Sequence, residues 1–149
     1  MKSILMVTVL AALPAAGMAE PVVVPSSGAV PETVQRLTDA IEAAGAQVFG
    51  VVDFGQGARS VGGDVGEIQL VIFGVPQIGA QVLAADRMAA LDLPGKVLVY
   101  DTAEGSAMAY EVPAEMLEEW SIPADAPVLG MMARTLRSLT ETAASGQSQ

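Results

Sequence analysis

The sequence predicts a single α+β domain, in which helices pack on a largely antiparallel sheet to form a sandwich. Three observations favour this class. The expected elements follow one another as strand, helix, strand, strand, helix, hairpin, helix and helix. Two neighbouring strands come from the hairpin, so they pair antiparallel. Few strand–helix–strand crossovers remain from which a parallel sheet could be assembled.

The first residues have the layout of a cleavable export signal. Lys2 precedes an apolar stretch over residues 4–16, and small residues follow it. That order predicts a signal peptide at residues 1–19, cleaved after Ala19. The alternative, an uncleaved membrane anchor, would need about 20 predominantly apolar residues, whereas this run is shorter and is interrupted by Pro14. We therefore expect a periplasmic protein with no membrane anchor after cleavage.

The exported chain, residues 20–149, has the length of one domain. We divide it into an extended segment at 20–32, an α+β domain at 33–142 and a small, polar, flexible tail at 143–149. Pro21 stands at the start of the extended segment, which favours an edge strand there because proline cannot donate to a sheet ladder.

The clearest helical pattern runs from Pro31 to Gly45. Apolar residues recur there at helical spacing on one face, and charged residues occupy the other face. Proline suits the first turn of a helix and glycine suits its end. The next segment, Ala46 to Asp53, is apolar on both alternations, which predicts a central strand covered on both faces.

The rest of the chain alternates loops with short elements. The glycine-rich residues 54–63 predict a loop with at most one helical turn, and residues 88–95 predict a second loop. Between these loops we expect a buried strand at 67–74 and a helix at 76–85. After them we expect hairpin arms at 96–101 and 106–112 and a short helix at 113–120. A last helix should begin near Asp125, and its apolar stripe consists of Leu129, Met132, Leu136 and Leu139.

The composition excludes several kinds of chemistry. The chain has seven basic and seventeen acidic residues, and removal of Lys2 leaves a net charge of −11. This charge repels phosphate backbones, so we expect no nucleic-acid partner. The chain has no cysteine and no histidine, which excludes thiolate sites and a Ser-His-Asp triad built from this chain alone. The carboxylates are scattered and do not alternate as in a calcium loop, so we predict no metal and no cofactor.

The turn after the second buried strand is a candidate binding site. Gly74, Pro76 and Gly79 lie where a strand runs into a helix that begins with proline. Such helix starts can bind an anion through free backbone N–H groups, and Gly74 would allow a close approach. The alternative is a sharp corner with no ligand. The stretch contains no lysine or arginine to neutralise an anion, so we favour the corner.

A second candidate follows the first central strand. Asp53, Phe54 and Arg59 lie at the end of that strand and in the glycine-rich loop after it. Asp53 could act as an acid or base if burial raised its pKa, and Arg59 could clamp a carboxylate or phosphate. The alternative is that Asp53 caps the loop and Arg59 pairs with a surface acid, which we favour because charged residues at strand ends usually do this.

The aromatic residues fall into three groups. Phe49 and Phe73 lie in apolar strands, and we expect both in the core. Tyr100 and Tyr110 lie on the two hairpin arms, where they could face each other or face a pocket. Phe54 lies in a loop, where it could cover a pocket or contact a partner.

Three stretches of the chain together resemble the domain of unknown function 302 family (DUF302), over roughly residues 33–117. The most specific parts of the resemblance are Phe-Gly-x-Pro-x-x-Gly and Leu-Asp-Leu-Pro. The stretches are the helix end at Gly45 with the strand end at Asp53 and Ala58–Gly62, the strand and turn Gln69–Gly79, and Ala90–Asp101 with its hairpin to Tyr110.

The resemblance implies a compact α+β domain, which in this family is often a homodimer, and it implies no established activity. Two positions depart from the family pattern. Phe54 stands where members commonly have histidine, and Val75 stands where they commonly have asparagine. Both replacements are apolar, so a ligand or metal role of those polar residues would be lost or altered here.

These observations favour a non-enzymatic exported domain that binds a small ligand or a periplasmic protein. The candidate ligand-binding residues are Asp53, Phe54, Arg59, Gly74, Pro76, Gly79 and Tyr100. Two alternatives stay open. One is an enzyme that uses Asp53 as base and Arg59 as anion clamp, and the other is a module whose function depends on dimer assembly.

Overall fold

The computed structural model describes residues 20–146 and confirms the α+β class. The expected signal peptide, residues 1–19, lies outside the described residues. Five strands form one sheet in the order β1-β5-β4-β3-β2, and every neighbouring pair is antiparallel. The strands are β1 (Val22–Ser26), β2 (Gln47–Asp53), β3 (Ile68–Gly74), β4 (Gly95–Thr102) and β5 (Gly105–Tyr110).

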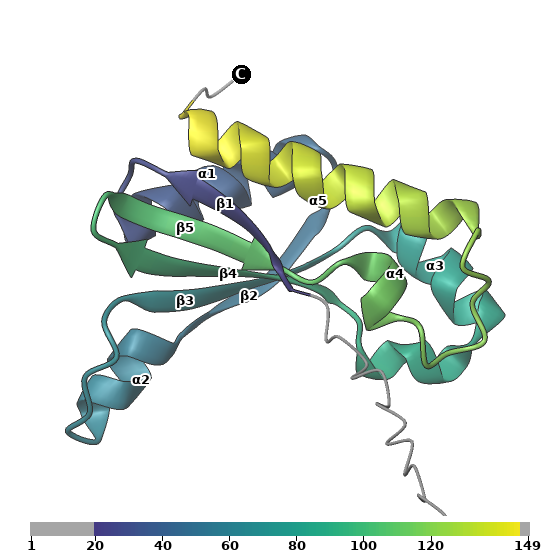
Figure 1. The fold of residues 1–149 in the computed structure, drawn as a ribbon, viewed down its shortest axis with the longest axis horizontal. Helices are drawn as coiled ribbons and strands as arrows, with labels where there is room; N and C mark the ends of the chain where they lie inside the picture. Colours follow the sequence, from purple (N-terminus) through teal and green to yellow (C-terminus); the bar gives the residue numbers. More distant parts are fainter. Residues whose placement is uncertain (1–19, 147–149) are drawn as a thin grey trace, which may run out of the picture.

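Helices cover one face of this sheet and one of its ends, and the short helix α2 lies near the other end (Figure 1). The two long helices, α1 and α5, lie on the same face, and α3 and α4 lie at the end of the sheet. The helices are α1 (Val30–Ala43), α2 (Phe54–Ser60), α3 (Pro76–Ala85), the 3-10 helix η1 (Arg87–Leu91), α4 (Pro113–Met116) and α5 (Pro127–Ser145).

Helix α1 forms where its apolar spacing predicts it. Pro31 lies in its first turn, and Gly45 follows it with a positive φ of 73°. Glycine adopts that left-handed conformation without a steric penalty, so the chain can turn directly into β2. The buried stripe of α1 packs on the sheet and consists of Val30, Thr33, Val34, Leu37 and Ile41.

The hydrophobic interior has two parts, which helix α5 connects. The sheet core lies between the sheet and the two long helices, and it includes Leu37, Val71, Phe73, Leu136 and Leu139. The end core lies among α3, η1, α4 and the first half of α5, and it includes Val82, Ala89, Leu117, Leu129 and Met132. The apolar stripe of α5 therefore serves both cores in turn.

Strand β2 was predicted to be a central strand covered on both faces. That prediction is wrong, because β2 lies at an edge of the sheet. Its pairing with β3 is interrupted between Val48 and Gly50, which places Phe49 in a bulge. Phe49 was expected in the core, yet 56% of its surface is exposed. The apolar residues of β2 do not face two layers of helices. Val48 packs against the sheet core, Phe49 lines a pocket, and Val52 lies on an uncovered face of the sheet.

Several other boundaries differ from the predictions, including η1 at the start of the loop expected at 88–95 and the end of α4 at Met116. Residues 54–60 form helix α2, because Asp53 caps it by accepting a hydrogen bond from the Gln56 N–H at 2.7 Å. Helix α1 begins at Val30, inside the segment expected to be extended. Helix α5 continues to Ser145, and Ala143, expected in the flexible tail, is fully buried in the sheet core.

A cluster of buried hydroxyl groups joins β1, α1 and β5. The Thr33 Oγ1 lies 2.9 Å from the Oγ atoms of both Ser26 and Ser106. An Nη2 group of Arg36 donates to Ser26 and Thr33 at 3.0 and 3.1 Å. This hydroxyl cluster connects the edge strand to the hairpin and to the first long helix.

Candidate ligand-binding site

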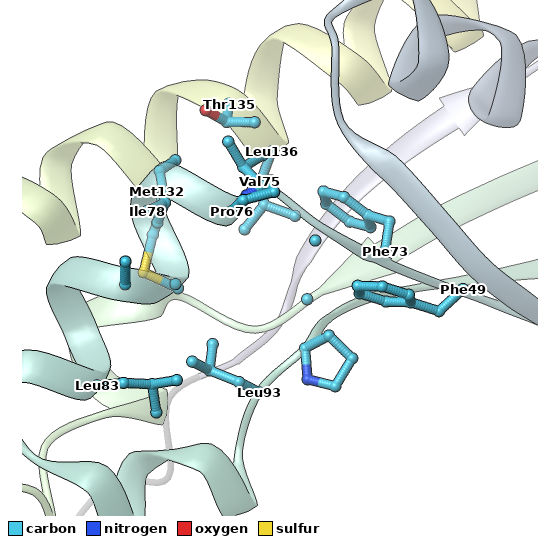
Figure 2. A pocket seen from close by; sticks show the side chains of 15 residues that line it. Phe49, Phe73, Val75, Pro76, Ile78, Leu83, Leu93, Met132, Thr135 and Leu136 are labelled. Carbon is cyan, nitrogen blue, oxygen red and sulfur yellow. The ribbon is translucent and has the colours of Figure 1, made fainter.

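A pocket of about 720 Å³ lies where the sheet core meets the end core. Residues from β2, β3, α3, the turn before β4 and α5 line it (Figure 2). The lining comprises Phe49, Phe73, Gly74, Val75, Pro76, Ile78, Gly79, Ala80, Leu83, Leu93, Pro94, Gly95, Met132, Thr135 and Leu136.

The corner between β3 and α3 forms part of one wall of the pocket. Strand β3 ends at Gly74, Val75 is the N-cap residue, and Pro76 starts helix α3. The proline fixes φ near the helical value, so the helix begins at once and turns its residues toward the pocket. On the neighbouring strand, Gly95 pairs with Phe73, which brings the turn before β4 alongside.

Two glycines allow the aromatic rings to lie against the backbone. A Cβ atom at Gly74 would come within 2.7 Å of Cε2 of Phe49. A Cβ atom at Gly95 would come within 3.3 Å of the Phe73 ring. The absence of these side chains therefore lets Phe49 and Phe73 form one wall of the pocket, which Figure 2 shows opposite Ile78 and Leu83.

The lining of the pocket is almost entirely apolar. Thr135 is the single residue of the lining with a polar side chain, and no lining residue is charged. Such a site offers no general acid or base and no anionic or cationic partner. What it offers is exclusion of water from an apolar surface, which favours binding of an apolar molecule.

Only some of the residues expected in a binding site line the pocket. Gly74, Pro76 and Gly79 line the pocket. Asp53 and Phe54 do not line it, because they lie at the start of α2, where Asp53 serves as the cap. The corner at Gly74 is therefore both a sharp turn and one wall of a cavity.

Arg59 and Tyr100 also lie away from the pocket lining. The Arg59 side chain lies near Gly55 within the α2 region. Tyr100 pairs with Ala107 and Ile68, whereas Tyr110 belongs to the sheet core. Because Leu98 pairs with Ala109, the two tyrosines fall on opposite faces of the hairpin, and they do not face each other.

Sequence reasoning missed several residues of the lining. Phe49 and Phe73 were assigned to the core alone, and Met132 and Leu136 were expected only as the stripe of the last helix. An apolar residue that faces a cavity has the same periodicity as one that faces a packed core. The sequence therefore carries no pattern that distinguishes the two.

A second surface is the face of the sheet opposite α1 and α5, called the open face below. Val97 and Val99 are buried in the sheet core, so Leu98 between them points to the opposite face. The register aligns one apolar row across all five strands, and most of its members are partly or largely exposed. That row is Val23, Ala109, Leu98, Leu70 and Val52.

Polar contacts hold the loops of the end core beside the pocket. The Asp86 carboxylate accepts hydrogen bonds from the N–H groups of Met88 at 2.9 Å and Ser121 at 3.1 Å. These bonds favour the ionised form and lower the pKa of Asp86, with the Met88 N–H as the larger cause. The Trp120 Nε1 donates to an oxygen of Asp92 at 2.5 Å. Both contacts join the α3–η1 region to the segment after α4.

The described residues lack two features that would point to other functions. Between residues 20 and 146, no group of three or more acidic side chains is placed to hold a metal ion. In the same part of the chain, no helix has the length and apolar character needed to cross a membrane.

Comparison with known proteins gives relatives of two kinds. A crystal structure of an uncharacterized conserved protein DUF302 from Bacillus stearothermophilus superimposes with a TM-score of 0.77 and 19% identity, covering 85% of this chain and 99% of the other. At that identity the likeness supports the fold alone.

The curated relatives are named fluoride-specific ion channels. The chain is 36% identical over 84 residues, 56% of its length, to FluC 1 from Brucella suis and from Brucella abortus. The aligned part spans 33% and 31% of those two proteins, so the chain corresponds to about a third of each.

The family comparison covers most of the chain. The family model described as "Domain of unknown function DUF302" matches residues 22–142. This range includes all five strands and most of α5. The chain therefore belongs to the DUF302 family.

Proposed function

We propose that this protein is an exported, non-enzymatic domain that binds an apolar small molecule in the pocket between the sheet core and the end core. The observation that carries the proposal is the pocket itself, about 720 Å³ in volume and lined by one polar side chain among fifteen residues. Its volume falls within the range of about 300–1,000 Å³ that is usual for small-molecule sites. The layout of residues 1–19 supports export to the periplasm.

The placement of the charged candidates argues against the enzyme alternative. Asp53 uses one carboxylate oxygen to cap α2, and its other oxygen lies 3.5 Å from the Gln69 amide. Neither Asp53 nor Arg59 contributes to the lining of the pocket. A ligand in the pocket would therefore meet no group able to transfer a proton.

The names of the curated relatives suggest fluoride as a ligand, but the pocket is unsuited to it. Fluoride is a small anion that loses its bound water when it enters a pocket. Positive charge or directed hydrogen-bond donors would have to replace that water. The lining offers no cationic side chain. We therefore propose an apolar ligand and not fluoride for this site.

A blocking variant tests ligand binding. Gly79 lines the pocket within α3, and a Cβ atom there would meet nothing within 4 Å. Gly79→Leu should therefore fill pocket space without a clash, and it should improve helix propensity. We expect the uncharged fluorescent probe 1-N-phenylnaphthylamine to bind the wild-type protein and to bind Gly79→Leu at least tenfold more weakly.

The matched control is Gly57→Leu. Gly57 lies in helix α2, away from the pocket, and a Cβ atom there also meets nothing within 4 Å. This variant should bind the probe as the wild type does. Equal binding to all three proteins, or no binding to the wild type, would refute the proposal.

A second proposed function is assembly of two copies through the open face. Five strands about 4.8 Å apart and about 20 Å long present roughly 500 Å² for each copy. Two such faces would bury about 1,000 Å², which reaches the lower limit for a specific interface. The apolar row can contact its own copy, whereas the acidic remainder of the surface repels a second copy elsewhere.

Three glutamate variants test this assembly. Leu98→Glu and Val52→Glu place charge on the open face, whereas Val61→Glu places it at a residue that is 84% exposed outside that face. Native mass spectrometry at micromolar concentration should find dimers of the wild type and of Val61→Glu, and monomers of the other two, with circular dichroism confirming the fold of each. A wild type that is monomeric in this measurement would exclude the assembly.

A further inference from the structure

We infer that the ligand of the pocket is an uncharged molecule with a flexible aliphatic chain, which lies between the sheet core and the end core. This inference rests on the proposed function, because it names the class of ligand for the same pocket. The pocket lies between the two cores, where α5 passes from one to the other. Met132 contributes to the end core and Leu136 to the sheet core, and both line the pocket.

The charge of the site selects against an ionised ligand. No lining residue is charged, and the whole chain has a net charge of −10. Burial of an unpaired charge in an apolar site is costly, and the acidic surroundings raise that cost further for an anion. A carboxylate or phosphate at the buried end of the ligand is therefore disfavoured relative to a hydroxyl or ester.

The hydrogen-bonding capacity of the lining limits the ligand to few polar atoms. Thr135 is the polar side chain of the lining, and its hydroxyl makes no side-chain hydrogen bond within residues 20–146. The hydroxyl of Thr140, five residues later in the same helix, instead donates to the Leu136 carbonyl at 2.9 Å. Thr135 can thus pair with one hydroxyl or carbonyl oxygen of a ligand.

The aliphatic side chains of the lining favour an aliphatic chain in the ligand. Figure 2 shows Phe49 and Phe73 on one side and Ile78, Leu83 and Met132 on the other. Met132 is unbranched and flexible, so this aliphatic side of the lining can adapt to a ligand with rotatable bonds. Since a water molecule occupies about 30 Å³ of liquid and a methylene group is of similar size, a chain of roughly ten to fifteen carbons occupies about half of the volume.

A homologous series of ligands tests the inference. The 1-alkanols from hexanol to dodecanol should displace 1-N-phenylnaphthylamine, with Kd falling about fourfold for each added methylene across the series. The carboxylate of the same chain length should bind at least tenfold more weakly than the alcohol. Thr135→Val should weaken decanol binding about two- to tenfold, through loss of one hydrogen bond.

The outcomes separate this inference from the proposed function. If Gly79→Leu abolishes probe binding but alcohol affinity does not depend on chain length, the pocket binds ligands of another class and the inference fails. It also fails if carboxylates bind as tightly as alcohols. If the probe does not bind at all, the proposed function fails as well. Unchanged decanol affinity in Thr135→Val would overturn the assignment of Thr135 as the polar contact.

Discussion

The hydroxyl cluster offers a test of buried polar bonding, because the chain contains a matched control. Thr33 and Thr140 are both helical, and both have 0% of their surface exposed. The perturbation is replacement of each by valine, which has the same shape without the hydroxyl. Thr33 bonds to side chains of other elements, whereas Thr140 bonds to carbonyls of its own helix.

The expected loss in free energy of unfolding depends on which hydrogen-bond partners each valine variant leaves unsatisfied. In Thr33→Val, the Ser106 hydroxyl is 1% exposed and loses its bond of 2.9 Å. An unsatisfied buried hydroxyl costs about 1–3 kcal/mol, and loss of the bond from Arg36 adds about 1 kcal/mol, so unfolding should require about 2–4 kcal/mol less free energy. In Thr140→Val, the carbonyls keep their helical N–H donors, so the change should stay within about 0.5 kcal/mol.

Urea denaturation followed by circular dichroism measures both values. Adding Ser106→Ala to Thr33→Val should restore roughly 1 kcal/mol, because the double variant removes both members of the pair. For a domain of this size, Thr33→Val should also lower Tm by roughly 10 °C. The reasoning would be refuted if the two single valine variants differed in stability by less than about 0.5 kcal/mol.

Three further predictions concern the stability of the fold. Gly105→Ala should destabilise the fold by about 2–4 kcal/mol in urea, because φ there is +138° and a Cβ atom would lie 2.7 Å from a backbone oxygen of β1; full retention of stability would contradict this. Asp86→Ala should destabilise the protein at pH 7. Since the folded pKa of Asp86 is lowered by the Met88 and Ser121 N–H groups, the difference from wild type should shrink as pH falls below about 4, and a gap independent of pH would exclude this role. Trp120→Phe should cost about 1–2 kcal/mol by loss of the bond to Asp92, and an unchanged Tm would count against that bond.

Local patterns predicted most of the elements. The helices at 30–43 and 76–85 and the hairpin of β4 and β5 formed where periodicity, proline and glycine placed them. The two errors have different causes. The middle of strand β2 is apolar on both faces, which is typical of a central strand, but β2 lies at the edge, where Phe49 lines the pocket and Val52 lies on the open face. Helix α2 formed despite two glycines because Asp53 caps it.

By itself, the sequence determined the α+β class, the absence of histidine and cysteine chemistry, the acidic charge and the sharp turn at Gly74. These depend on composition or on neighbours along the chain, which a sequence records directly. Only the tertiary structure decided that Phe49, Leu93 and Thr135 meet across the same cavity. They come from three elements far apart in the chain, and an apolar side chain has the same local pattern whether it faces another side chain or an empty volume.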